Sequence, residues 1–145
     1  MGKQKSEEKH FLNLAGEYGV CSELAKRKIT ASITYGNHKA ADIIVMKTEG
    51  KEKKALTIEV KTTPTNRIVT GFFQKYKTPD ISGPDIWVIV HIGGNSQSTY
   101  YVMTHKEVSE AQMKRNNMQS WHEVNGVDNL LIKDIEFYKD RWDII

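Results

Sequence analysis

The chain has 145 residues, of which 39% are hydrophobic and 27% charged, with a formal net charge of +3 at pH 7. This length suits a single domain with its own hydrophobic core, so we expect one domain over residues 1–145, with residues 1–5 disordered. A mean hydropathy of -0.54 without a long apolar run argues against a membrane span. The single cysteine, Cys21, and the lack of a secretory signal pattern favour a cytoplasmic protein.

The first half of the chain predicts a helix followed by three strands. The helix is expected to begin near Ser6, and apolar residues recur along it at three- and four-residue spacing, which predicts one stripe packed on the core. The members of that stripe are Phe11, Leu14, Ala15, Tyr18, Cys21, Leu24 and Ala25. β-Branched and aromatic residues then predict strands over residues 29–35, 41–46 and 55–62. The short turns between these strands favour an antiparallel meander.

The second half of the chain is less regular. Residues 63–84 contain the three prolines and predict only a short helix or ordered loop near residues 71–77. The nearly continuous apolar run at 86–92 predicts a strand that is covered on both faces. Thr104 and Glu107 have the spacing of a capping box, which predicts a helix start. The remaining expected elements are a strand over 100–103, an end of that helix near Met118 and a last helix from Lys133.

Three charged residues stand out because they lie within or beside otherwise apolar strands. Asp42 opens the second predicted strand, while Glu59 and Lys61 lie late in the third and point to the same face. Folding these strands into a hairpin brings residue 42 across from residues 59–61. The two carboxylates, with the backbone carbonyl of Val60, are hard oxygen ligands that suit Mg²⁺ or Mn²⁺. The alternative is a surface salt-bridge cluster in which Lys61 pairs with Asp42 across the strands.

These residues, in the segments Ala-Ala-Asp42-Ile-Ile-Val and Ile58-Glu59-Val60-Lys61, resemble the PD-(D/E)xK nuclease superfamily, which includes Holliday-junction resolvases. The resemblance implies a restriction-endonuclease-like fold, which is a single α/β domain with an αβββαβ core and a mixed central sheet flanked by helices. It also implies that a helix glutamate joins the metal site, and Glu17 stands at that position. Ala41 replaces the proline of the family label.

The resemblance implies a divalent-metal-dependent endonuclease that hydrolyses phosphodiester bonds of DNA. Asp42, Glu59 and the Val60 carbonyl would bind Mg²⁺ or Mn²⁺, Glu17 would assist directly or through a water, and Lys61 would act on the attacking water. Because cutting both strands usually needs two active sites, a homodimer is expected, and the small size favours structure-selective cutting or a partner protein for targeting. Two alternatives stay open: a non-catalytic nucleic-acid-binding or protein-interaction module on the same fold, and an RNA-directed nuclease or toxin.

Candidate nucleic-acid contacts lie outside the carboxylate cluster. Basic and aromatic residues interleave after the third strand, in a pattern that suits phosphate binding and base stacking, although a loop with a buried Phe72–Phe73 pair explains it equally well. With two turn residues before Asp42, these candidates are His38, Lys39, Arg67, Lys75, Tyr76 and Lys77. Residues 1–61 hold 12 lysines and arginines against 8 acids. Seven lysines of this half, if they face the acidic pocket, would form a phosphate-attracting rim: those at 26, 28, 39, 47, 51, 53 and 54.

Overall fold

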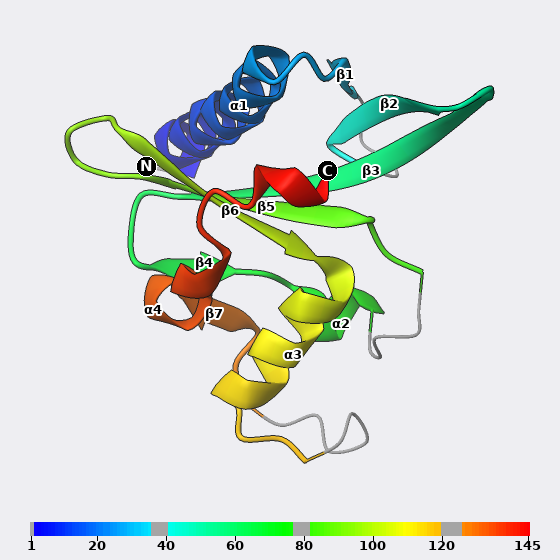
Figure 1. Cartoon of the computed structure of the whole chain (residues 1–145). Coiled ribbons are helices and arrows are strands. Elements are labelled where there is room, and N and C mark those ends of the chain that lie inside the picture. The colour runs from blue at the N-terminus through cyan, green and yellow to red at the C-terminus, as the bar shows by residue number, and fades with distance from the viewer. Residues whose placement is uncertain (1, 36–40, 77–81, 120–125) are drawn as a thin grey trace.

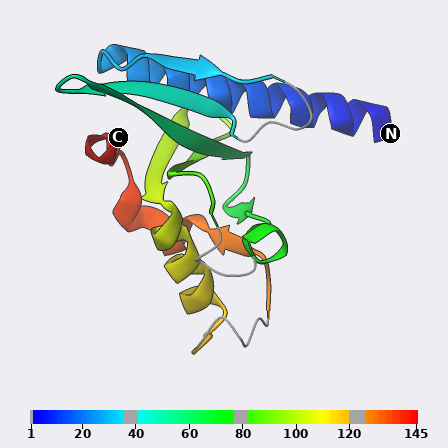
Figure 2. The same cartoon turned by 90° about the vertical axis from the view of Figure 1, so that its right-hand side faces the viewer.

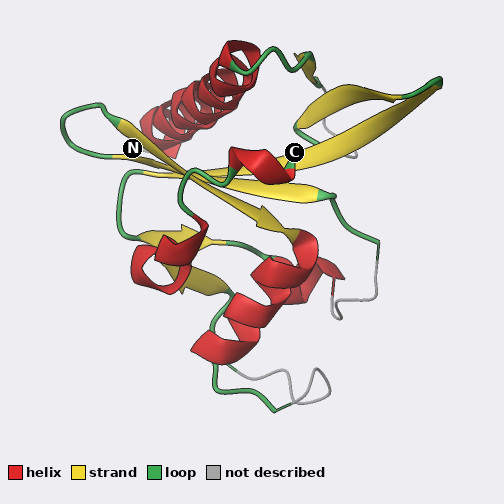
Figure 3. Cartoon of the chain, viewed as in Figure 1, coloured by secondary structure: helices red, strands yellow, loops and turns green. Residues whose placement is uncertain are grey.

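The computed structural model describes residues 2–35, 41–76, 82–119 and 126–145 (Figure 1, Figure 3). Its helices and strands are, in chain order, α1 (Gly2–Lys26), β1 (Ala31–Ile33), β2 (Ile43–Glu49), β3 (Glu52–Thr63), β4 (Arg67–Val69), α2 (Phe72–Tyr76), β5 (Ile86–Ile92), β6 (Ser98–Thr104), α3 (His105–Arg115), β7 (Asn129–Leu131) and α4 (Ile132–Ile135). Two 3-10 helices, Glu136–Tyr138 and Trp142–Ile144, follow α4. None of the described helices is long and apolar enough to cross a membrane.

The central sheet has five strands in the order β1-β2-β3-β5-β6. β1, β2 and β3 form the expected antiparallel meander, β3 pairs with β5 in parallel, and β5 pairs with β6 in antiparallel fashion. The parallel pair is reached by a crossover through β4 and α2, as two parallel strands require. The predicted fold class is therefore confirmed: a mixed sheet flanked by helices, with α1, β1 to β3, α2 and β5 in the αβββαβ order of the restriction-endonuclease-like fold.

Apolar side chains cover both faces of this sheet. On one face, Leu24 of α1 and Trp142 of the last 3-10 helix belong to a cluster with side chains of β2, β3 and β5. On the other face, α2, α3 and the two-stranded sheet β4–β7 enclose a cluster around Trp87. Figure 2 shows these layers from the side, with α1 above the sheet and α2, α3 and α4 below it. The predicted two-sided burial of β5 is confirmed for residues 86–90, because its central position leaves neither face to solvent.

Helix α1 differs from the predicted helix in its start and in the face that it buries. It begins at Gly2, earlier than the expected start near Ser6. The predicted core stripe is right for Leu24 and for the half-buried Cys21, but it is wrong for Phe11 and Tyr18, which are 68% and 54% exposed. The buried residues of α1 are Gly16, Glu17, Val20 and Leu24. Much of the apolar repeat therefore lies on the solvent side of the helix.

Two glycines explain why α1 turns this face inward. A Cβ atom added at Gly16 would collide with the side chain of Thr62 on β3, and one added at Gly19 would collide with the Tyr100 hydroxyl on β6. A helix can approach the strands this closely only at positions that carry no side chain. The close contact seats the middle of α1 directly on β3, and this determines where Glu17 lies.

The end of the chain does not form the single predicted helix. α4 stops at Ile135, and the chain then runs beside the edge of β6, where Lys139 forms a bridge with Tyr101 and the Asp140 N–H donates to the Tyr100 carbonyl at 2.9 Å. The backbone of Asp140 has a φ of 54°, which a right-handed helix cannot accommodate. The tail thus covers part of an edge that would otherwise be open to pairing with another chain.

Helix α3 begins as the sequence predicts. The Glu107 N–H donates to Thr104 Oγ1 at 3.2 Å and the Thr104 N–H donates to Glu107 Oε2 at 2.8 Å, so the capping box is confirmed. The helix ends at Arg115, before the expected end near Met118. Asn117 has a φ of 53°, a left-handed conformation that terminates the helix.

Candidate active site

The candidate site lies where β3 runs past the start of β2. The register pairs Ile43 with Ile58, so in the described part of the chain β2 offers no ladder partner to residues 59–63. Asp42 occupies this end of the hairpin, because the Val60 N–H donates to Asp42 Oδ2 at 2.8 Å and the Asp42 N–H donates to the Ile58 carbonyl at 3.1 Å. The expectation that residue 42 lies across from the late part of β3 is confirmed.

The backbone of Val60 faces this same open edge. In a strand, the N–H and C=O of one residue point to the same side, and the Val60 N–H points to Asp42. The carbonyl oxygen of Val60 is therefore directed to the edge at which the Asp42 carboxylate lies. This is the arrangement that a backbone ligand beside a carboxylate ligand would require.

Glu59 and Lys61 lie on one face of β3, as strand alternation predicts. Lys61 Nζ lies 3.4 Å from Glu59 Oε1, so this ion pair runs along the strand. Glu59 is only 9% exposed. A buried carboxylate is unfavourable without a compensating charge, and Lys61 supplies one.

Glu17 approaches the same region from α1. It is 8% exposed, although ionised side chains are rarely buried, because the contact between Gly16 and Thr62 seats this turn of the helix on β3.

The carboxylates of Asp42 and Glu59 both affect the pKa of a common neighbour, Tyr76. Burial raises the pKa of Tyr76 to about 12, and the negative charges of Glu59 and Asp42 add to that rise. Negative charge thus gathers at one place in the fold.

A cleft of about 570 Å³ collects these side chains. Its walls come from α1 (Lys9, Leu12, Asn13 and Glu17), from Asp42, from residues 59–63 of β3 and from residues 67–71 at and after β4. Lys9 and Asn13 were not expected from the sequence. Lys9 lies two helical turns before Glu17 and Asn13 lies one turn before it, so both are on the same side of the helix. The sequence could have indicated them as site residues only if Glu17 was already assigned to the site.

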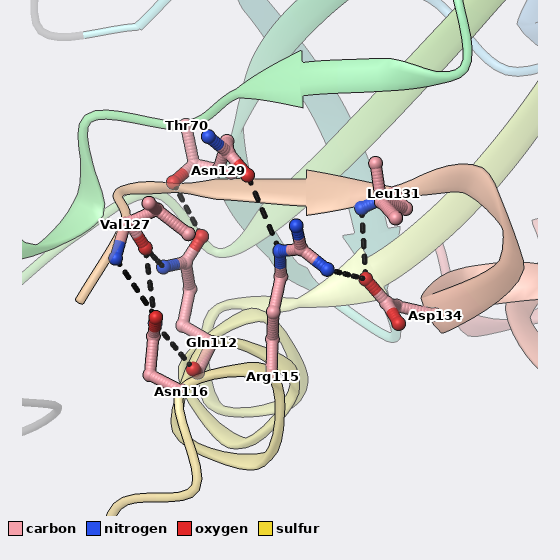
Figure 4. Close-up of polar contacts among 8 residues, drawn as sticks. All are labelled: Thr70, Gln112, Arg115, Asn116, Val127, Asn129, Leu131 and Asp134. Carbon is pink, nitrogen blue, oxygen red and sulfur yellow. Dashed lines mark hydrogen bonds and ion pairs between the residues drawn. The ribbon is translucent and has the colours of Figure 1, made fainter.

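The wall that β4 contributes is held in place by polar contacts to α3 (Figure 4). Thr70 Oγ1, which lines the cleft region, donates to Gln112 Oε1 at 2.7 Å, and Gln112 is fully buried. Arg115 Nε donates to Asn129 Oδ1 at 3.2 Å, and Arg115 Nη1 lies 3.5 Å from Asp134 Oδ2. Buried and satisfied polar contacts of this kind specify one arrangement. The small sheet β4–β7 therefore has a defined position against α3 and forms a fixed wall of the cleft.

The oxygen donors of the cleft suit a hard divalent cation. Mg²⁺ is usually bound by one or two carboxylates, with water and substrate phosphates completing its shell, and Asp42, Glu59 and the Val60 carbonyl provide such a partial set. Among the described residues, no three His, Cys, Asp or Glu side chains gather closely enough to hold a metal ion by themselves. Asp42, Glu59 and the Val60 carbonyl thus offer a partial set of oxygen ligands, which a hard divalent cation would complete with water.

The predicted nucleic-acid contacts have mixed outcomes. Arg67 lines the cleft, and Lys75 is exposed with its Nζ 5.5 Å from the centre of the Tyr76 ring. The expectation that Tyr76 stacks on a base is wrong, because its side chain is 5% exposed and packs edge-on against Trp87 at 6.0 Å. The alternative explanation, in which Phe72 and Phe73 are buried, is confirmed. The other candidates, His38, Lys39 and Lys77, lie outside the described residues.

The expected rim of lysines is wrong for the hairpin of β2 and β3. The register places Lys47 opposite Lys54, near the tip of the hairpin, whereas the cleft lies at the other end, beyond the pair Ile43–Ile58. Along β3 the separation between Lys54 and Lys61 is roughly 20 Å. Among the described residues, the cations that line the cleft are instead Lys9, Lys61 and Arg67.

No protein-family model matches the chain, and no curated protein matches it. Among solved structures, a similar one is the 1.6 Å structure of Hjc, a Holliday junction resolvase from the archaeal hyperthermophile Archaeoglobus fulgidus. The two structures align with a TM-score of 0.48 and 11% sequence identity, over 89% of this chain and 96% of that chain.

Proposed function

We propose that this protein is a divalent-metal-dependent endonuclease that hydrolyses phosphodiester bonds of DNA. The observation that carries the proposal is that Asp42, Glu59, Lys61 and Glu17 line one cleft at the open end of β3. Glu17 and Glu59 are almost fully buried there. Burying several carboxylates together is unfavourable for a purely structural cluster, whereas a site that binds a cation needs them.

Each residue has a role that follows from its position. Asp42, Glu59 and the Val60 carbonyl would hold Mg²⁺ or Mn²⁺, and Glu17 would assist through a water. When bound, the cation would polarise the phosphodiester and lower the pKa of a bound water. The Val60 N–H, which donates to Asp42 Oδ2 at 2.8 Å, fixes the orientation of that carboxylate before any ligand arrives.

Lys61 would serve the attacking water. Its ion pair with Glu59 holds the ammonium group on the face of β3 that lines the cleft. An ammonium group there can orient or deprotonate the water, or neutralise the charge that develops on the phosphate. Lys9 from α1 and Arg67 from β4 would bind neighbouring phosphates, because cations at the border of the cleft attract the nucleic-acid backbone.

The test compares wild-type protein with Lys61→Met and Lys54→Met on supercoiled, linear and four-way-junction DNA, in Mg²⁺, in Mn²⁺ and in EDTA. Lys54 is a matched control, because it lies on the same strand and pairs with Glu49 at 3.0 Å, away from the cleft. We expect metal-dependent cleavage by the wild type and by Lys54→Met, and a loss of about 10²-fold or more in Lys61→Met. Asp42→Asn should also weaken Mn²⁺ binding measured by calorimetry.

Three other outcomes would contradict this proposal, and two of them would identify an alternative function. Equal cleavage by the wild type and Lys61→Met would refute the assignment of the site. Cleavage of RNA but not of DNA would identify an RNA-directed nuclease with the same metal chemistry. Retention of DNA without cleavage and without metal binding would identify a non-catalytic nucleic-acid-binding module on this fold.

A further inference from the structure

The N-terminal part of α1 extends beyond the rest of the fold. Residues 2–11 of this helix, called the overhang below, are all exposed, whereas the buried residues of α1 begin at Gly16. Figure 2 shows these first turns continuing past the end of β3. Helical turns without tertiary packing are only marginally stable in water, so a ligand that contacts the overhang would stabilise it.

The side of the overhang that continues the sheet-facing side of α1 is basic. At about 100° per residue, Lys9 and Lys5 point within about 20° of Gly16, the residue that contacts β3. Glu7 and Glu8 point about 180° and 80° away from that direction. A lysine near the start of a helix opposes the helix dipole, and the first turn of α1 contains no acid to offset Lys5. This lysine is thus unfavourable for the helix by itself and favourable for an anion bound beneath it.

We propose that the overhang and β4 hold a single strand of DNA that enters the cleft, an inference that rests on the nuclease function proposed above. Lys9 lines the cleft together with Arg67 of β4. Lys5 lies one helical turn further out, about 6 Å along the helix axis. The phosphate to be cut would lie at the acidic end of the cleft, and the phosphates beyond it would follow Lys9 and then Lys5, because a row of cations tracks the backbone of a nucleic acid.

The two walls of the cleft lie close together. Gly16 of α1 lies against Thr62 on one face of β3. The next residue, Thr63, points to the other face, and its Oγ1 donates to the carbonyl of Arg67, the first residue of β4, at 2.7 Å. The space between α1 and β4 is therefore little more than one strand thick. A double helix, whose major groove alone is about 12 Å wide, does not fit between these walls, whereas a single strand does.

Apolar side chains on both walls also favour an unpaired nucleotide. Leu12 of α1 and Val69 of β4 both line the cleft, and Val69 is 69% exposed although it lies in a strand. The base faces of a single strand are open to contact with such side chains, whereas those of a duplex are stacked on one another. A cationic groove combined with contacts to base faces is the general pattern of sites that bind single strands.

Binding measured by fluorescence anisotropy in EDTA tests the proposal without any cleavage. The probes are a labelled single strand of about 16 nucleotides, a blunt duplex that contains the same strand, and that duplex with a single-stranded tail. We expect the single strand and the tailed duplex to bind about tenfold or more tightly than the blunt duplex. Equal or tighter binding of the blunt duplex, or no binding of the single strand at about 100 µM protein, would overturn the proposal.

Lys5→Gln isolates the contribution of the overhang, because Lys5, unlike Lys9, is not a lining residue of the cleft. Lys3→Gln is the matched control, since Lys3 belongs to the same helix but points about 140° away from Gly16. Each phosphate contact that is lost reduces the salt dependence of log K by about 0.7 for a single strand. We expect this change, with a weakening of about three- to tenfold, in Lys5→Gln and not in Lys3→Gln. Equal effects of the two substitutions would overturn the proposal.

The two proposals fail separately. Metal-dependent cleavage that is lost in Lys61→Met, together with unchanged single-strand binding in Lys5→Gln, would support the nuclease function and refute this inference. Preferred binding of the single strand through Lys5, without metal-dependent cleavage, would refute the nuclease function and support the bound single strand.

Discussion

Gly16→Ala is expected to displace α1 from the sheet, because the added Cβ would overlap the side chain of Thr62. The Thr62 hydroxyl is buried and has no hydrogen-bond partner among the described residues, so it lies in a tight space beneath the helix. Forcing an extra carbon into a packed contact costs about 1–3 kcal/mol. Replacing glycine by alanine within a helix returns up to about 1 kcal/mol. We therefore expect the free energy of unfolding to fall by about 1–2 kcal/mol.

Urea unfolding followed by circular dichroism measures this loss, and Gly2→Ala is the matched control. Gly2 also belongs to α1, but an added Cβ there meets nothing within 4 Å, so this variant should be as stable as the wild type or slightly more stable. Combining Gly16→Ala with Thr62→Ala removes the closest overlap, which is with Thr62 Oγ1, and the double-mutant cycle should show a coupling energy of about 1 kcal/mol or more. A gain in stability in Gly16→Ala, equal to that in Gly2→Ala, would refute the reasoning.

Two further variants test the wall of the cleft and the aromatic cluster beside it. Gln112→Leu should lower the free energy of unfolding by about 1 kcal/mol in the same urea assay, because it removes the hydrogen bonds to Thr70 Oγ1 at 2.7 Å and to the Val127 carbonyl at 3.3 Å. Thr70 keeps Asp128 as a partner and the Val127 carbonyl keeps Asn116, which limits the loss; an unchanged midpoint would contradict this. Burial lowers the pKa of His105, whose Nδ1 accepts from Trp87 Nε1 at 3.0 Å. The unfolded state then binds the proton more readily, so stability should fall as the pH drops below about 6.5, with a slope under about 1.4 kcal/mol per pH unit. Measurements between pH 7.5 and 5.5 that show the same slope in His105→Phe would assign the effect to another group.

The strand part of the site was predictable because it depends on short-range features of the chain. Alternation along one strand places Glu59 and Lys61 on a common face, and a tight turn between two strands fixes their register. Those two rules suffice to bring Asp42 across from the end of β3. The same reasoning applied to charge was wrong for the lysines near Lys47 and Lys54, because it counted cations along the chain and ignored which end of the hairpin they occupy.

The orientation of α1 was not predictable, because periodicity identifies a stripe without saying what the stripe meets. The helix has two candidate faces, one with aromatic residues and one with Gly16 and Gly19. Apolar content favours the first face as the buried one. In the folded molecule the second face is the buried one. Its glycines let the backbone of α1 approach side chains of β3 and β6, and a row of large side chains would prevent that approach. β4 and β7 were missed for another reason, as three-residue strands are too short to show an alternation.

The candidate site forms where the ladder between β2 and β3 stops, at the pair Ile43–Ile58, while β3 continues. Had β2 continued pairing, its backbone would have bonded the Val60 N–H; instead a side chain, the Asp42 carboxylate, makes that bond. The residue that ends the ladder therefore also presents an acid beside a backbone edge, and Glu59 adds a second acid from the strand that continues. The middle of α1 then covers this end of β3 and brings a third acid, Glu17, from a direction that the sheet cannot supply. Because the glycine contact that places Glu17 also turns Phe11 and Tyr18 to solvent, the geometry of the cleft and the exposure of these two aromatic side chains have one structural cause.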